Sequence, residues 1–127
     1  MNLEKVVFGF FIILAMTLNF SFVYGTIDDP RHHSLIEFFV VVVVNVIATT
    51  LKLGDRTQIG ALLLATSLVA DLQLIAAALI WTHGAHIAEG GLSYHAFVLV
   101  ISLSAGALLA NVVSVIIVVS ETLMLRR

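Results

Sequence analysis

The sequence of 127 residues contains no cysteine, so disulfide bonds, thiolate metal sites and thiol redox chemistry are excluded. Charged residues are scarce, at 11% of the chain, whereas a soluble domain carries about 25%. The formal net charge is −2, so no basic field would attract nucleic acid. By contrast, 61% of the residues are hydrophobic, which is more than a water-soluble protein of this size can bury. The natural solvent of this chain is therefore a lipid bilayer.

Motifs that carry catalysis or cofactor binding are missing as well. The sequence has no Gly-rich phosphate loop, no Ser-His-Asp arrangement and no HExxH helix. It also lacks a potassium-filter motif such as TVGYG. We therefore predict neither an enzyme nor a resident cofactor.

Four segments are long and apolar enough to cross hydrocarbon, which takes about 20 residues in a helix. They comprise residues 6–25, 35–53, 59–81 and 94–119. The run FFVVVVV in the second segment would suit a buried strand, but an open strand in lipid leaves its backbone groups unpaired, so we predict a helix. The prediction is an all-α, polytopic membrane protein in which residues 1–127 form one domain of four transmembrane helices.

The basic residues predict the orientation of these helices. Only Arg31 lies on one side of the four-span arrangement, and the other five Lys and Arg residues lie on the opposite side. These five are Lys5, Lys52, Arg56, Arg126 and Arg127. By the positive-inside rule we predict that both termini are cytoplasmic. An alternative treats residues 6–25 as a cleaved signal peptide, which would leave three spans in the same orientation.

The short connection GDRTQ, residues 54–58, combines a helix stop with a helix start. Gly54 suits the C-terminal end of the second helix. Asp55, with Gln58 three residues further on, suits the N-cap of the third. The sequence thus predicts a tight turn on the basic side of the membrane.

Asp71 is the most unusual residue, because it lies near the middle of the third predicted span. Inserting an Asp at the centre of a membrane helix costs about 2.5–3.5 kcal/mol. No Lys, Arg or His lies at the same predicted depth. The side chain can be protonated, can face a wet cavity that holds a cation, or can pair with a group on another subunit.

Other polar residues lie at helical spacings that could bring them near Asp71. These are Asn45 and Thr49 on the second helix, Ser67 on the third and Asn111 on the fourth. One interpretation is that they form interhelical hydrogen bonds, each worth about 0.6–2 kcal/mol in a membrane. The other is that they line a path for protons or small cations with Asp71 as the carrying group.

The fourth helix carries a stripe of small residues four positions apart. The stripe consists of Ser102, Gly106, Ala110 and Ser114. Such "small-xxx-small" spacing lets another helix approach closely. The partner is either a helix of the same bundle, a second copy of the chain or a larger membrane protein.

His83 and His86 are three residues apart on the predicted outer side, so one helical turn would place their imidazoles together. With neighbouring carboxylates they form a candidate site for zinc, copper or nickel. They would also suit an outward-facing pH sensor. The alternative is that they are ordinary exposed loop residues.

The segment TTLKLGDRTQIGALLLATSLVADLQL, residues 49–74, resembles small uncharacterised four-helix inner-membrane proteins of bacteria. This resemblance implies a fold and a location but no activity. The chain is also close in size to the small multidrug resistance transporters, whose key Glu lies in the first membrane helix. Residues 6–25 contain no Glu, so the chain departs from that family.

Two functional hypotheses follow from these patterns. The first is an integral membrane protein that moves or senses a small cation or proton, as a homo-oligomer, with Asp71 as its central residue. The second is a non-conducting accessory or assembly subunit of a larger membrane complex. A conducting protein needs polar groups that face one another, whereas an accessory subunit needs them to face a partner.

Overall fold

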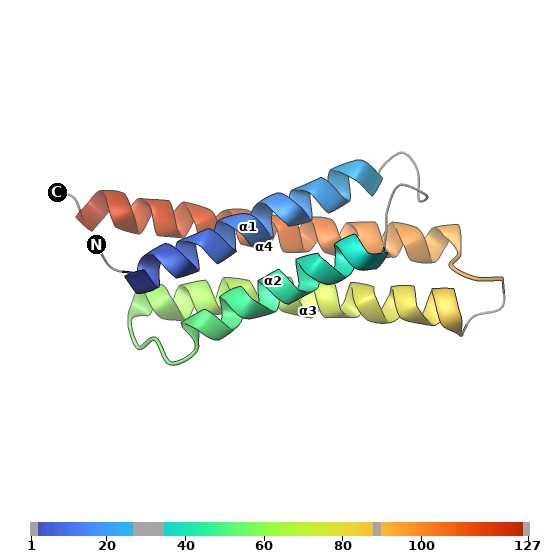
Figure 1. Cartoon of the computed structure of the whole chain (residues 1–127), viewed down its shortest axis with the longest axis horizontal. Helices are drawn as coiled ribbons and strands as arrows, with labels where there is room; N and C mark the ends of the chain where they lie inside the picture. Colours follow the sequence, from blue (N-terminus) through green and yellow to red (C-terminus); the bar gives the residue numbers. More distant parts are fainter. Residues whose placement is uncertain (1–2, 27–34, 88–89, 126–127) are drawn as a thin grey trace.

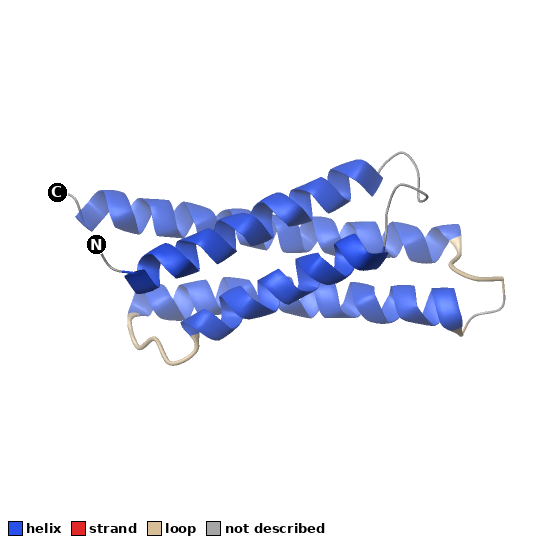
Figure 2. Ribbon diagram, in the orientation of Figure 1, coloured by secondary structure: helices blue, strands red, loops and turns tan. Residues whose placement is uncertain are grey.

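The computed structural model describes residues 3–26, 35–87 and 90–125, which form four α-helices. The helices are α1 (Leu3–Thr26), α2 (Leu35–Lys52), α3 (Gln58–His86) and α4 (Tyr94–Leu125) (Figure 1). Within the described ranges all regular structure is helical, as Figure 2 shows, so the all-α prediction is confirmed there. Arg31, Arg126 and Arg127, which contribute to the predicted orientation, lie outside these ranges.

The helices form an antiparallel ring. α1 packs against α2 and α4, and α3 packs against the same two helices. Figure 1 shows α1 and α2 as a front layer over α3 and α4, with the start of α1 and the end of α4 at the same end of the bundle. We call this the basic end, after Lys5 and Lys52. The opposite end is the histidine end, after His83 and His86.

Three of the helices are long and apolar enough to cross a membrane. They contribute Leu3–Tyr24, Gln58–His86 and Tyr94–Met124. α2 has 18 residues, so it rises about 27 Å at 1.5 Å per residue. The length and composition of the three longer helices indicate a membrane protein.

Large apolar side chains cover the outside of the bundle. Leu72 and Leu79 on α3 are 70% and 68% exposed, and Leu109 on α4 is 66% exposed. On α2, Phe39 is 63% exposed. A soluble monomer rarely exposes such a continuous apolar surface. Lipid accommodates it without cost, so the bundle surface agrees with the helix lengths.

The third helix ends at His86, whereas the sequence had predicted an end near Trp81. Gly84 lies in its last turns, where an added Cβ would come within 2.5 Å of Leu92 Cδ1. The absence of a side chain at Gly84 therefore lets the chain fold back closely over the end of α3. Gly90 and Gly91 have positive φ angles, which suit a change of chain direction before α4. His83 and His86 consequently lie on a helix.

Thr57 caps α3, so the prediction of Asp55 at this position is wrong. The Thr57 side chain accepts a hydrogen bond of 2.9 Å from the Gly60 N–H, as an N-cap residue does. Asp55 supports the cap from outside, because its Oδ1 accepts from the Thr57 hydroxyl at 2.7 Å and the Thr57 N–H at 2.9 Å. These bonds hold the pKa of the Asp55 carboxyl below its ordinary value. Gly60 is required here, since its Cβ would meet the Asp55 carboxyl group.

We predict that Thr57→Ala destabilises the folded protein by about 1 kcal/mol, because the Gly60 N–H loses its capping acceptor. The measurement is thermal unfolding of the purified protein in detergent. Thr122→Ala is the matched control, since the exposed Thr122 hydroxyl only donates to Val118 O of its own helix. Equal melting temperatures for the two variants would contradict the capping role.

Two apolar clusters fill opposite halves of the bundle core. Phe22, Phe38 and Trp81 pack together near the histidine end, with ring centroids 5.1 Å, 5.4 Å and 6.0 Å apart. We call these three residues the aromatic cluster. Near the basic end a smaller cluster contains Phe8 and Leu63. Buried polar side chains lie between and among the residues of the two clusters.

Candidate functional site

Every helix contributes buried polar side chains to the interior of the bundle. Together we call them the polar band: Asn19, Asn45, Thr49, Ser67, Asp71, Ser104, Asn111 and Ser114. Each is at most 9% exposed. Because lipid offers no hydrogen bonds, polar groups in this position depend on one another for partners.

Asp71 is tied to α2 by one hydrogen bond. The Thr49 hydroxyl donates to Asp71 Oδ2 at 2.5 Å, although Thr49 is near the end of α2 and Asp71 is near the middle of α3. Helical side chains tilt toward the N-terminus of their own helix, and α2 and α3 are antiparallel. The two side chains therefore lean toward each other and close the gap in depth.

The Thr49 hydroxyl has two possible acceptors and only one proton. Its oxygen lies 2.5 Å from Asp71 Oδ2 and 3.0 Å from the carbonyl oxygen of Asn45. When Asp71 is charged, the Thr49 hydroxyl donates its hydrogen bond to the carboxylate. When Asp71 is protonated, its own O–H can donate to Thr49, which frees the Thr49 proton for Asn45 O. Thr49 thus accommodates both protonation states of Asp71 without a change in packing.

The second carboxyl oxygen of Asp71 is buried without a partner. Among the described residues, no group hydrogen-bonds Asp71 Oδ1. Ser67 Oγ, one turn away on the same buried face of α3, is also without a partner there. Leaving buried polar atoms unpaired costs about 1–3 kcal/mol each. Each such atom therefore calls for a physical explanation.

Charged side chains of the neighbouring helices lie far from Asp71 along the bundle. Among the described residues, Glu37 is near the start of α2, and Lys52 is at its end. On α1 the charged residues are Glu4 and Lys5, and Glu121 is in the last turns of α4. The carboxyl group therefore has no counter-ion at its own depth in the described part of the chain.

Asn111 reaches the depth of Asp71 from α4. Gly106 faces Gln73, since a Cβ on Gly106 would lie 2.8 Å from the Gln73 amide. Eight residues along α4, Ser114 Oγ lies 2.5 Å from Thr66 Oγ1. Asn111 is between these two contacts, and it is fully buried with no partner for either amide atom among the described residues.

No hydrogen bond joins the described Asn45 and Asp71 side chains, although the two were predicted at similar depth. Its side-chain nitrogen donates to Val41 O of its own helix at 2.8 Å. Asn19 on α1 bonds the backbone of α4. Its amide donates to Ser104 O at 3.1 Å and accepts from the Leu108 N–H at 3.1 Å. The side chains of both asparagines therefore bond backbone groups. By contrast, Asp71 Oδ1 and the Asn111 amide have no partner among the described residues.

The predicted stripe on α4 is only partly inside the bundle. Gly106 and Ser114 contact α3, but Ser102 is exposed and Ala110 is half-buried. The fully buried face of α4 instead follows alternating spacings of three and four. It consists of Val100, Ser104, Ala107, Asn111 and Ser114. This heptad-like spacing was the signal that would have identified Ser104 as a core residue.

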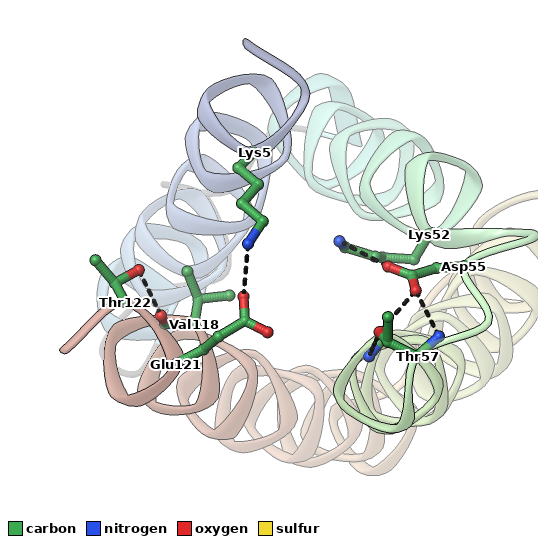
Figure 3. Close-up of polar contacts among 8 residues, drawn as sticks. Lys5, Lys52, Asp55, Thr57, Val118, Glu121 and Thr122 are labelled. Carbon is green, nitrogen blue, oxygen red and sulfur yellow. Dashed lines mark hydrogen bonds and ion pairs between the residues drawn. The ribbon is translucent and has the colours of Figure 1, made fainter. Parts of the chain in front are cut away.

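The basic end of the bundle is lined by two ion pairs, which Figure 3 shows on opposite sides of its mouth. Lys5 Nζ lies 3.5 Å from Glu121 Oε1 and joins α1 to α4. Lys52 Nζ lies 3.4 Å from Asp55 Oδ2 and 4.4 Å from the centre of the Phe8 ring. The histidine end of the core carries the apolar aromatic cluster instead.

His83 and His86 lie in the last turn of α3, and both are exposed. No third Cys, His, Asp or Glu joins them in a metal-binding group within the described part of the chain. The structure therefore adds nothing in favour of the predicted metal site at this pair.

These features define a class of protein: an all-helical bundle with three helices apolar enough to cross a membrane and a polar band inside it. The chain belongs to a family of unknown function, DUF6394, which matches residues 32–122. This range contains every residue of the polar band except Asn19. No curated protein and no solved structure matches the chain.

We predict that Thr49→Val destabilises the protein by about 1–3 kcal/mol near neutral pH, because it leaves the buried Asp71 carboxyl group without its donor. Valine keeps the shape of threonine and removes only the hydrogen bond. Thermal unfolding in detergent measures the effect, with Thr50→Val as the control. The adjacent Thr50 is exposed, and among the described residues its hydroxyl bonds only Val46 O of its own helix. A Thr50→Val loss as large as that of Thr49→Val would argue against the Asp71 contact.

Proposed function

We propose that this protein binds and releases a proton or small cation at Asp71, and thereby moves or senses that ion across a bacterial inner membrane. In this proposal α2 is a fourth span beside the three longer helices. The basic end and both termini face the cytoplasm, as the distribution of Lys and Arg predicts. The protein has no catalytic role.

One observation carries this proposal: Asp71 is buried at the middle of the bundle with one oxygen bonded and the other without a partner among the described residues. A carboxyl group that served packing alone would be expected to have both oxygens satisfied. An ionisable side chain that retains a free oxygen inside a membrane bundle is suited to taking up a cation.

The geometry favours a proton over a metal ion. Asp71 Oδ1 has almost no accessible surface, and a metal ion needs several oxygen ligands and the volume that they enclose. A proton needs no such volume. The Thr49 hydroxyl can also change its bonding with the protonation state of Asp71, because it is near both the carboxyl group and Asn45 O.

Assembly into a homo-oligomer belongs to the same proposal. The aromatic cluster closes the described part of the bundle toward the histidine end, so helices of a second copy would complete a wet path. The accessory-subunit alternative is favoured by a different observation. A fully apolar hollow of about 430 Å³ on α2, lined by Ile36, Phe39, Val40, Val43 and Val44, could receive a helix of a larger partner. The inward direction of the polar band supports the first proposal over the second.

We predict that Asp71→Asn reduces ion flux to the level of protein-free liposomes, because the amide cannot take up and release a cation. The protein is reconstituted with a trapped pH-sensitive dye, and proton uptake is driven by a potassium diffusion potential. Parallel uptake of radioactive sodium distinguishes the two ions. Glu4→Gln is the control, since Glu4 is exposed at the start of α1.

Size-exclusion chromatography of each variant shows whether assembly is preserved. Wild-type flux in a correctly assembled Asp71→Asn protein would refute the role of Asp71. Absence of any flux in the wild-type protein would instead favour the accessory subunit.

A further inference from the structure

A small cavity opens into the bundle at the basic end. Its volume is about 60 Å³, and residues of all four helices line it. They are Lys5, Phe8, Lys52, Leu63, Val118, Glu121 and Thr122. The two ion pairs of this end stand around its opening, as Figure 3 shows. The cavity is thus a polar approach to the bundle core from the basic end.

The floor of the cavity is a thin apolar barrier. Phe8 and Leu63 belong both to the cavity lining and to the apolar cluster of the basic end. From Leu63 to Ser67, where the polar band begins on α3, the helix rises about 6 Å. A single helical turn therefore separates the cavity from the unpaired oxygen of Ser67.

The barrier toward the histidine end contains the aromatic cluster. From Asp71 to Trp81 α3 rises about 15 Å. The aromatic cluster and the fully buried Leu74 and Ala77 occupy this stretch, together with the buried polar side chains of Asn19 and Ser104 from the neighbouring helices. Measured along α3 from Asp71, Leu63 lies about 12 Å away and Trp81 about 15 Å away. The nearer of the two adjoins the charged cavity, whereas the farther belongs to the aromatic cluster.

From this asymmetry we infer that Asp71 exchanges its cation through the cavity at the basic end, with Phe8 and Leu63 as the constriction and Glu121 as the outermost proton acceptor. This inference rests on the proposed function of Asp71. The Glu121 side chain is 25% exposed, so solvent reaches it. The charged groups around it are Lys5 on α1, Lys52 on α2 and Asp55 before α3.

Phe8 is well placed to control the constriction. Its side chain is 3% exposed, and the Lys52 ammonium group lies 4.4 Å from the centre of its ring. Lys52 is in turn held by Asp55, so a rearrangement of this ion pair would release the ring. Because Lys52 lies one turn after Thr49 on α2, the same rearrangement would reach the partner of Asp71.

The natural absence of cysteine allows a direct test of this route. Ser67→Cys places a thiol of similar size beside Asp71. Val118→Cys places a thiol in the cavity. The side from which silver reacts with this thiol shows which side of the membrane the cavity faces. Silver ions, added to one side in chloride-free buffer, probe each thiol, and the unreacted thiols are counted by alkylation in denaturant.

We expect silver to reach Ser67→Cys only from the side at which it reaches Val118→Cys. Adding Phe8→Ala speeds this reaction, whereas adding Phe22→Ala, the matched truncation in the aromatic cluster, does not open the other side. Leu63→Ala replaces Phe8→Ala if the latter does not assemble. Reaction from the opposite side, or from neither side in any variant, would overturn the route. This readout does not depend on flux, so it can fail while Asp71→Asn still abolishes transport.

The role of Glu121 has its own test in the liposome assay. We expect Glu121→Gln to lower proton flux about tenfold, because the mouth loses its proton acceptor. Lys5→Met breaks the same ion pair but keeps the carboxylate, so its flux should stay near the wild-type value. Equal losses in both variants would show that the ion pair, and not proton acceptance by Glu121, sustains the flux.

Discussion

The hydrogen bond between Thr49 and Asp71 is the constraint around which the interior of this protein is arranged. It joins α2 to α3 at 2.5 Å in a region where water does not compete for either group. In such surroundings a polar atom is satisfied by a neighbouring side chain or remains unpaired. Thr49 satisfies one oxygen of Asp71 and, through its second contact with Asn45 O, can do so in both protonation states.

The buried polar residues differ in their bonding, and the hydroxyl groups of Ser67 and Ser104 have no partner among the described residues. Asn19 and Asn45 hold backbone carbonyl groups, and Ser114 meets Thr66, so these residues act in helix packing. Asp71 Oδ1 and the amide of Asn111 have no partner among the described residues. Interhelical packing explains the bonded residues. It does not explain the unpaired atoms, and this difference is why we assign the ion-binding role to Asp71.

The two ends of the core are physically unlike. Ion pairs and a small cavity occupy the basic end, and three packed aromatic rings occupy the histidine end. An ion crossing an apolar barrier meets a cost that grows with the length of the barrier. A protein with this asymmetry would load its site from the basic end. Transport to the histidine end would then require the aromatic cluster to move. Trp81, the single tryptophan of the chain, belongs to that cluster and would report such a movement.

Much of this architecture was predictable from the sequence, because the transfer of a side chain into lipid is largely a local property. Hydrophobicity and spacing alone indicated the helices, the central depth of Asp71 and the concentration of Lys and Arg at one end. The partner of Asp71 was decided only by the tertiary structure. The rotation of each helix about its axis depends on packing against two neighbours, and this rotation brought Thr49, and not Asn45, to the carboxyl group. The same packing turned Ser104 and Asn111 inward and Ser102 outward. The cap of α3 was likewise decided by the turn after Gly54, which has a positive φ angle and is followed by Thr57, whose hydroxyl accepts from the Gly60 N–H.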